Sequence, residues 1–130
     1  MINMESKFNC PLCDAETILY YEFREKKYNS CPVCKSIIMN PMHYLTRQEE
    51  KERYMEHNND VDDSRYQKFV SPIVRAVQCA YKPEQIGLDY GCGTGPVISK
   101  LLRDDGFQIE QYDPFFAYYP DKLRGKYDYI

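Results

Sequence analysis

The amino-acid sequence predicts a mixed α/β chain, in which a small β module is followed by a helical linker and by part of a parallel sheet. Three observations predict this order. Two cysteine pairs lie in the first third, a long amphipathic helical pattern lies in the middle, and a glycine-rich turn follows an apolar strand near the end. We expect three parts, at residues 1–44, 45–84 and 85–130.

The charge balance and hydropathy narrow the classes of partner. The 130 residues include 17 basic and 20 acidic side chains, for a net charge of −3. This charge disfavours a nucleic-acid groove built on bulk positive potential. No apolar run approaches the ~18–20 residues of a membrane span, and Met1–Asn9 lacks the apolar stretch of a secretory signal. We therefore expect a cytoplasmic protein with no membrane partner and no strong nucleic-acid signal.

The first part is predicted to consist of short strands. Thr17–Phe23 is rich in β-branched and aromatic residues, which favour a strand, and Ser36–Met39 forms another. The charged stretch Arg24–Lys27, followed by Asn29 and Ser30, has the composition of a turn.

Four cysteines form two C-x-x-C pairs with 17 residues between them: Cys10 and Cys13, then Cys31 and Cys34. Two such turns can supply the tetrahedral four-sulfur shell of structural zinc. In so short a segment the metal would replace an apolar core. Two disulfides or four free thiols are the alternative, and iron, as in rubredoxin-like sites, shares the ligand set. The pattern predicts structural zinc, and the segment resembles a zinc ribbon.

Two helices are predicted in the linker. Thr46 is a good N-cap for a mostly polar helix that runs to about His57. Ser64 is the expected cap of a second helix that reaches about Tyr81, with Pro72 inside it. The apolar side chains of this second helix recur at the spacing of a helix buried on one face: Tyr66, Phe69, Val70, Ile73, Val74, Val77, Ala80 and Tyr81.

The third part alternates strands and helices. Strands are predicted at Ile86–Tyr90, Phe107–Tyr112 and Tyr127–Ile130, with a helix through Val97–Leu102 between the first two. Parallel strands need other elements packed on both faces of the sheet, and an exposed edge strand tends to pair with another chain. We expect the helix at 64–81, a protein partner or a second copy to cover this sheet.

The glycine-rich turn, Asp89–Gly95, differs from a dinucleotide fingerprint, because Pro96 occupies the position of the third glycine in G-x-G-x-x-G. Asp89 ends the strand, and a carboxylate there suits a positively charged ligand better than a pyrophosphate. S-adenosylmethionine carries an ammonium and a sulfonium. Asp113 ends the next strand, where an acid can accept both ribose hydroxyls. Phe115 can pack on adenine.

On these residues the chain resembles the class I S-adenosylmethionine-dependent methyltransferases, and more specifically bacterial members that carry an N-terminal zinc ribbon. Tyr54, His57–Asn59 and Tyr112–Phe116 strengthen the resemblance. It implies a partial Rossmann-like parallel sheet and methyl transfer to an unknown acceptor.

The resemblance also implies roles for individual residues. Asp89, Gly91, Cys92 and Gly93 would line the methionine end of the cofactor, and Asp113 would hold the ribose. Gly95, Pro114 and Phe115 complete the predicted cofactor site. Cys92 needs no redox role, since a small side chain fits the loop. The pattern identifies no catalytic base.

Two features depart from the family pattern. Too few residues separate Asp113 from Asp128 for the usual helix and strand, and the chain ends within an apolar strand. We expect a truncated chain that lacks the C-terminal half of the catalytic domain and is inactive alone. The alternative functions are a non-enzymatic zinc-binding interaction module with a remnant sheet and, less favoured, a fragment of a dinucleotide oxidoreductase.

Overall fold

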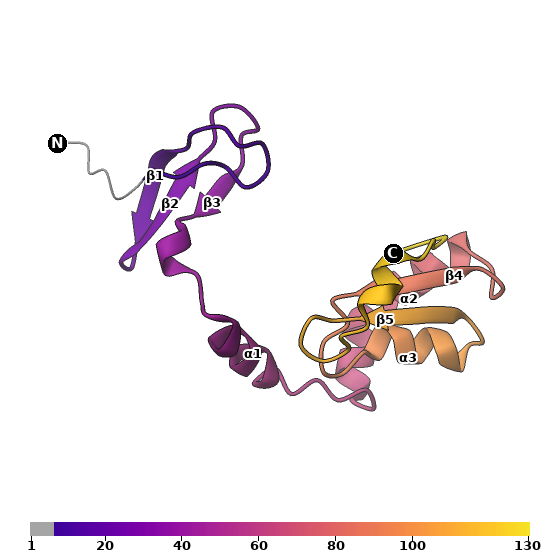
Figure 1. The fold of residues 1–130 in the computed structure, drawn as a ribbon. Coiled ribbons are helices and arrows are strands. Elements are labelled where there is room, and N and C mark those ends of the chain that lie inside the picture. Colours follow the sequence, from indigo (N-terminus) through magenta and orange to yellow (C-terminus); the bar gives the residue numbers. More distant parts are fainter. Residues whose placement is uncertain (1–6) are drawn as a thin grey trace. The chain divides into compact units, whose positions relative to one another are not determined.

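The structure, a computed structural model, describes residues 7–130, and the chain divides into two compact units between Arg47 and Gln48 (Figure 1). Residues 1–6 lie outside the described residues. They belong to the predicted first part and to the segment Met1–Asn9, which lacks the apolar stretch of a secretory signal. The prediction of mixed helices and strands is confirmed: one sheet is antiparallel and the other is parallel. Across residues 7–130, no helix combines the length and apolar character that crossing a membrane requires.

The first unit contains a three-stranded antiparallel sheet in the order β1 (Ile18–Phe23), β2 (Lys26–Ser30) and β3 (Ile37–Met39). A short 3-10 helix, η2 (Pro41–His43), follows β3. The predicted strands at 17–23 and 36–39 correspond to β1 and β3, within one residue at each start.

The middle strand, β2, corrects the sequence prediction, which treated Arg24–Lys27 and the residues after it as a turn. The turn itself is only Arg24 and Glu25, which take positive φ values of 47° and 64°. Such values match a two-residue hairpin turn whose twist suits the flanking strands. Asn29 in β2 is fully buried, so this strand buries a polar side chain and lacks the apolar alternation that would reveal it.

The second unit begins with α1 (Arg47–Met55) and α2 (Ser64–Ala80), close to the predicted helices. Asp63, rather than Ser64, is the N-cap of α2, since its side chain accepts a hydrogen bond from the Arg65 N–H. Pro72 lacks an N–H, so the carbonyl of Lys68 loses its helical donor. The Ser71 hydroxyl donates to that carbonyl at 2.8 Å instead.

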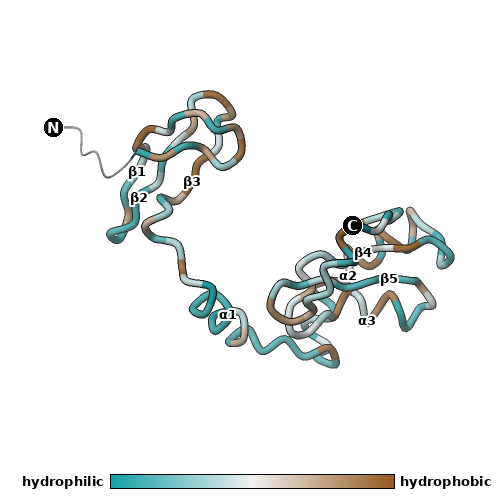
Figure 2. The backbone as a smooth tube through the Cα atoms, in the orientation of Figure 1, coloured by the Kyte–Doolittle hydropathy of each residue, from teal (hydrophilic) through white to brown (hydrophobic). Residues whose placement is uncertain are grey.

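Part of the apolar stripe of α2 is exposed, which contradicts the prediction that the whole stripe is buried. Val70 and Val74 are buried, whereas Phe69 is 77% exposed and Ile73 is 56% exposed. Figure 2 shows α1 as a largely hydrophilic helix, in agreement with its having no buried residue.

The rest of the second unit is β4 (Ile86–Tyr90), α3 (Val97–Asp104), β5 (Gln108–Tyr112) and the 3-10 helix η3 (Pro120–Arg124). β4 and β5 pair in parallel with Ile86 opposite Gln108. The predicted strand at 127–130 is reduced to a parallel bridge between Gly87 and Tyr129. The Leu88 N–H donates to the Tyr129 carbonyl at 3.0 Å. The chain therefore adds β5 on one side of β4 and Tyr129 on the other.

The apolar core of the second unit lies between the two helices and the sheet. A methyl group on Gly87 would overlap the ring of Tyr129, whose hydroxyl donates to the Gln108 carbonyl at 3.2 Å. Glycine at this position therefore allows an aromatic ring to cross β4 and reach β5. The buried members of the core are Val70, Val74, Val97, Leu102, Phe107, Ile109 and Tyr129.

Candidate functional site

The two cysteine pairs lie in tight turns with the same backbone hydrogen bonds. In the first turn the Cys10 N–H donates to the Ala15 carbonyl at 2.8 Å, and the Asp14 N–H donates to the Cys10 carbonyl at 2.8 Å. Asp14 has a φ of 61°. The equivalent bonds of the second turn run from Cys31 to Ser36 (2.9 Å) and from Lys35 (φ 64°) to Cys31 (3.0 Å). One local structure is thus formed twice and presents two sulfurs each time.

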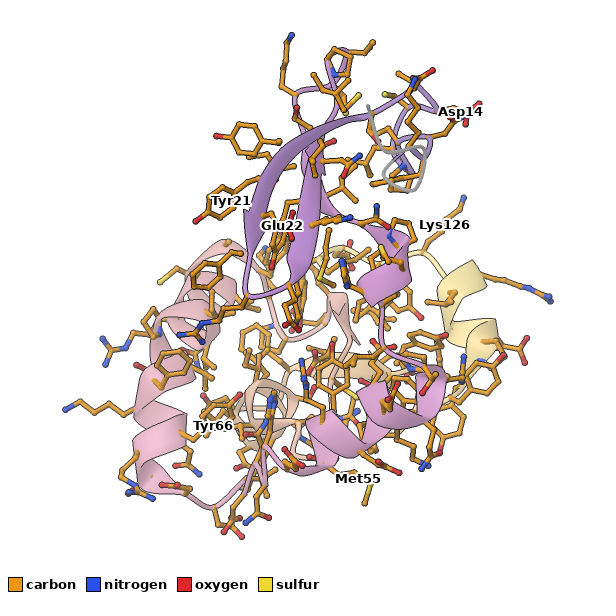
Figure 3. All side chains as sticks on the ribbon, turned by 90° about the vertical axis from the view of Figure 1, so that its left-hand side faces the viewer. Asp14, Tyr21, Glu22, Met55, Tyr66 and Lys126 are labelled. Carbon is orange, nitrogen blue, oxygen red and sulfur yellow. The ribbon has the colours of Figure 1, made fainter. Side chains whose placement is uncertain are left out.

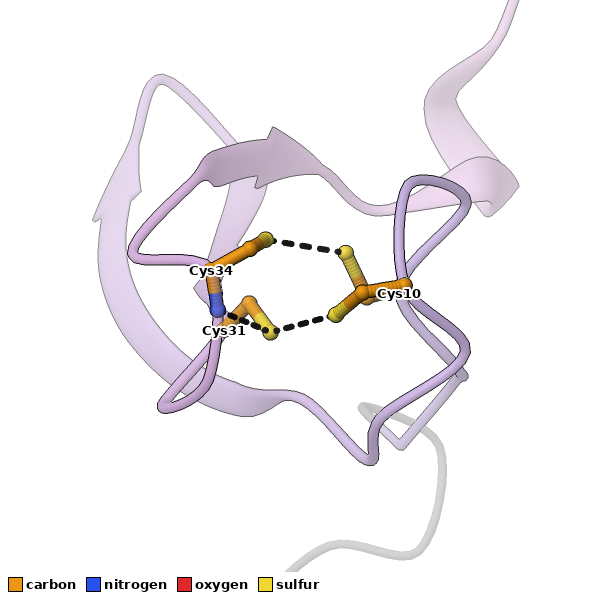
Figure 4. Close-up of side chains that lie close together, drawn as sticks. Cys10, Cys31 and Cys34 are labelled. Atoms are coloured by element: carbon orange, nitrogen blue, oxygen red, sulfur yellow. Dashed lines mark hydrogen bonds between the residues drawn. The ribbon is translucent and has the colours of Figure 1, made fainter.

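The four sulfurs converge between these turns (Figure 4). Sγ of Cys10 lies 3.6 Å from Sγ of Cys34, and Sγ of Cys13 lies 3.4 Å from Sγ of Cys31. All four atoms lie within 4.8 Å of one another. A tetrahedral zinc with bonds of ~2.3 Å separates its sulfurs by ~3.8 Å. The separations are too long for disulfides, which bond at ~2.05 Å, and they fit a four-thiolate metal site.

Ser36 adds a polar contact to the sulfur cluster. Its Oγ lies 3.0 Å from Sγ of Cys34 and 3.5 Å from Sγ of Cys10. Hydrogen bonding to Ser36 lowers the pKa of Cys10 to about 6 and also lowers the pKa of Cys34. The Ala15 N–H lowers the pKa of Cys13, but its sulfur neighbours and desolvation outweigh this and raise it to about 11. The cluster therefore favours thiolates at some positions before any metal is present.

The first unit has no aliphatic or aromatic core within residues 7–47. Its buried residues are Cys10, Thr17, Asn29, Cys31 and Asn40. The Thr17 hydroxyl donates to the Phe8 carbonyl at 2.6 Å, and the Asn29 amide donates to Thr17 at 3.1 Å. Sulfur atoms and a polar network thus occupy the place that apolar side chains fill in larger units.

The second candidate site is the turn between β4 and α3. Gly91 and Gly93 have φ values of 80° and 70°, in the left-handed region that favours glycine. A methyl group at either Cα would meet no atom within 4 Å, so the turn is open on this side. Both residues belong to the predicted cofactor site.

The first three amides of this turn already have protein acceptors. The Gly91 and Cys92 N–H groups both donate to the Tyr112 carbonyl, at 2.7 and 3.1 Å, and the Gly93 N–H donates to Oδ2 of Asp113 at 3.0 Å. A pyrophosphate cradle needs free amides at such a turn. The hydrogen bonding therefore weighs against a dinucleotide here, and the sequence pattern does not reveal it.

Gly95 is a glycine for a different reason from Gly91 and Gly93. A methyl group at its Cα would overlap the backbone carbonyl of Asn59. The segment between α1 and α2 therefore lies directly against the glycine-rich turn. Gly95 was predicted to belong to the cofactor site, and its contact with the Asn59 carbonyl was not predicted.

Asp113 joins the two loops at the carboxyl ends of the strands. It is 7% exposed, and its Oδ1 accepts the N–H groups of Phe115 at 2.8 Å and Phe116 at 3.1 Å. Its Oδ2 accepts the Gly93 N–H. A carboxylate offers about four acceptor positions, so one remains on Oδ2. Asp113 was predicted to accept two ribose hydroxyls, and the second of them would have to displace a backbone N–H from the carboxylate.

Asp89 is half-buried at the end of β4. Oδ2 of this residue accepts the hydroxyl of Ser99, a fully buried residue of α3, at 2.6 Å. Burial, reinforced by the negative charges of Asp89 and Asp113, raises the pKa of Cys92 to about 11. Two carboxylates therefore lie close to the turn, and Cys92 is a protonated thiol near neutral pH.

Pro114 and Phe115 follow Asp113 in the turn after β5. The ring of Phe115 lies 6.3 Å from that of Tyr54 in α1, centroid to centroid, with a tilt of 42°. This contact joins α1 to the predicted adenine side of the site. Ser99 and Tyr54 were not among the predicted site residues. Asn59 belongs to the stretch His57–Asn59, which was predicted to be a helix end and turn, with contact to cofactor or acceptor as the alternative.

Two cavities meet at Asp89 and Ile98. A pocket of about 120 Å³ lies under the glycine-rich turn and includes Gly91, Cys92 and Gly95. An apolar groove of about 600 Å³ runs along β4 beside α2.

Comparison with protein-family models, with curated proteins and with solved structures finds no match to this chain.

Proposed function

We propose that the chain is an S-adenosylmethionine-binding methyltransferase unit, with a partial Rossmann-like sheet, preceded by a zinc ribbon. The topology of the second unit supports this proposal. β5 pairs with one side of β4, and Tyr129 pairs with the other side. The chain therefore extends the sheet first in one direction from β4 and then in the opposite direction. In open α/β sheets, ligands bind beyond the carboxyl ends of the strands at such a reversal. Asp89, the glycine-rich turn and Asp113 all lie at this end.

The observation that carries the proposal is the charge and hydrogen bonding of the glycine-rich turn. Its first three amides are occupied, and two carboxylates lie beside it. Negative potential attracts the ammonium and sulfonium of S-adenosylmethionine and repels the pyrophosphate of a dinucleotide. The dinucleotide oxidoreductase alternative is correspondingly weakened.

The residues present fit this cofactor. Asp89 would attract its cationic end, Gly91 and Gly93 leave room beside it, and the remaining acceptor position of Asp113 would take a ribose hydroxyl. When bound, the cofactor supplies an electrophilic methyl group for a nucleophile on the acceptor. The chain's own contribution is to orient the cofactor and the acceptor, which accounts for much of catalysis in well-oriented reactions. The acceptor remains unassigned.

In the same proposal, zinc is held by Cys10, Cys13, Cys31 and Cys34 and has a structural role. Four thiolates close its coordination shell and leave no position for a substrate. The absence of buried aliphatic side chains between residues 7 and 47 supports this role, since the metal is then the main source of cohesion.

The test is isothermal calorimetry of the full chain with S-adenosylhomocysteine and, separately, with NAD. We expect binding of the first ligand only. Asp89→Asn keeps an acceptor for Ser99 but removes the charge, and should weaken S-adenosylhomocysteine binding about tenfold or more. Asp121→Asn, at an exposed aspartate of η3, is the matched control and should have no effect. Binding of NAD alone, or unchanged affinity in Asp89→Asn, would contradict the proposal.

A second candidate function, a non-enzymatic interaction module, is favoured by β1. All six of its residues are exposed, including Ile18, Tyr20 and Tyr21, although five of them are apolar or aromatic. Figure 3 shows the ring of Tyr21 projecting from the strand. Apolar exposure of this kind often marks a protein interface. Binding of neither S-adenosylhomocysteine nor NAD by the metal-loaded chain would favour this alternative.

A further inference from the structure

The last residues of α1 and the residues that follow this helix reach the predicted cofactor site. We define residues 54–59 as the cover segment. At its start, the ring of Tyr54 lies against Phe115, and at its end the carbonyl of Asn59 lies against Gly95. Two independent contacts thus place this segment across both loops that follow β4 and β5.

The path of the cover segment depends on local turn geometry. The His57 N–H donates to the Tyr54 carbonyl at 3.2 Å, and Asn58 has a left-handed φ of 43°. Asparagine tolerates this conformation better than most residues. The ring of His57 packs edge-on against Tyr54 at 5.8 Å, which supports the orientation of the tyrosine.

Phe115 is held in a defined position relative to Asp113. Its N–H donates to Oδ1 of Asp113 at 2.8 Å, while Oδ2 of the same carboxylate retains one acceptor position. A nucleoside whose ribose hydroxyl bonds to Asp113 therefore has its base near Phe115. The ring of Tyr54 packs against that of Phe115, and Tyr54 is 44% exposed.

We propose that Tyr54 forms the second wall of a purine-nucleoside site, so that an adenine ring is held between Tyr54 and Phe115. This inference rests on the proposed function and names a further binding residue for it. A planar base between two rings needs about 7 Å between them, from two contacts of ~3.5 Å each. The two ring centroids lie 6.3 Å apart with a 42° tilt, so the rings must separate and turn parallel to admit the base.

The displacement required of Tyr54 costs little. None of the residues of α1 is buried, so the helix moves without opening an apolar core. The chain beyond the cover segment is anchored, because Val61 packs on the core and its carbonyl accepts the Gln67 side chain at 2.7 Å. The cover segment can therefore move while the chain at Val61 stays in place.

The test compares two ligands in the full, metal-loaded chain by calorimetry. S-adenosylhomocysteine carries the amino-acid part, whereas 5′-methylthioadenosine carries only the nucleoside and its thioether. We expect Tyr54→Leu to weaken both ligands by the same factor, about tenfold, because base stacking is lost in each. Tyr54→Phe keeps the ring and should bind like the wild type. Asp89→Asn should weaken S-adenosylhomocysteine only.

Controls separate a binding role from a structural one. Tyr119→Leu removes a comparably exposed tyrosine of the same unit and should leave both affinities unchanged. Thermal unfolding without ligand should be similar for Tyr54→Leu and the wild type. If the wild type binds and Tyr54→Leu binds equally well, the inference about Tyr54 is wrong and the proposed function stands. If the wild type binds neither ligand, the proposed function itself fails, and this inference with it.

Discussion

The two units of this chain differ in what fills their interiors. Between residues 7 and 47 the buried side chains are two cysteines and three polar residues, whereas the second unit buries a cluster of valine, leucine, isoleucine and aromatic side chains. The first unit is too small to bury enough apolar surface to offset its conformational entropy. In the proposed metal-bound state, metal ligation and apolar burial are alternative sources of stability within one chain.

Cys10 in the first unit and Cys92 in the second differ in pKa because their surroundings differ, while Cys13 in the first unit also has a raised pKa. Hydrogen bonding to Ser36 lowers the pKa of Cys10 to about 6, while burial beside two carboxylates raises the pKa of Cys92 to about 11. A lowered pKa suits a metal ligand and a raised one suits an inert thiol in a packed loop. The position of a cysteine relative to donors and acids therefore decides its chemistry.

The largest expected effect is that of metal removal. A strong chelator, or Cys31→Ser, should unfold residues 7–47, since structural zinc contributes on the order of 10 kcal/mol in such domains. The second unit should keep its structure. Hydrogen-exchange mass spectrometry, with metal analysis of the purified chain, measures both. Protection that persists in β2 and β3 without metal would contradict a metal-dependent first unit.

The reverse experiment removes apolar packing from the second unit. Leu102 in α3 is fully buried, and Leu102→Ala should lower its free energy of unfolding by about 2–5 kcal/mol. Zinc content and exchange protection of the first unit should not change. Leu45→Ala, at an exposed position of the first unit, is a matched control that should have little effect. A loss of zinc in Leu102→Ala would show that the two units are not independent.

A smaller effect is expected at the crossing of Tyr129 over β4. Gly87→Ala places a methyl group against the tyrosine ring and should cost about 1–3 kcal/mol of stability in urea unfolding. Tyr129→Leu in the same chain should recover part of that loss, because the two residues interact directly. Additive effects of the two substitutions would mean that the ring does not constrain residue 87.

The smallest expected effect concerns Ser36. Ser36→Ala removes a hydroxyl that contacts two sulfurs and should lower zinc affinity about tenfold, as loss of groups that support metal ligands commonly does. The fold of the second unit should be unaffected. Competition with a chromophoric chelator measures the affinity. Ser71→Ala in α2, distant in sequence from the four clustered cysteines, should leave zinc affinity unchanged.

Local patterns in the sequence predict most of the helices and strands. α2, β4, α3 and β5 agree with their expected ranges to within about two residues at most ends, because each carries a strong apolar period. β2 was not predicted, since its buried residue is an asparagine paired with Thr17. The strand expected at 127–130 forms only a bridge at Tyr129. In both places a partner far along the chain decides the structure.

The candidate sites also combine features that the sequence predicts with features that depend on contacts between distant segments. The spacing of the cysteines predicts their convergence, because two identical turns on a hairpin bring four sulfurs together. Asp89 and Asp113 could be recognised from their positions at the ends of strands. The Tyr112 carbonyl and the Asp113 carboxylate accept N–H groups of the glycine-rich turn, and the Asn59 carbonyl lies against Gly95. These contacts depend on which loops meet in space. No pattern of neighbouring residues contains that information.

The local turns, the apolar faces and the types of side chain available for metal and ligand binding follow from residues a few positions apart, so they can be predicted from the sequence. The contact of Tyr54 with Phe115, the choice of the glycine that faces a neighbouring chain segment, and the set of backbone amides that remain free arise only in the folded chain. Those features arise from contacts between distant segments. Whether a backbone donor is paired, and whether a cavity exists, depends on the residues that surround it in the folded chain.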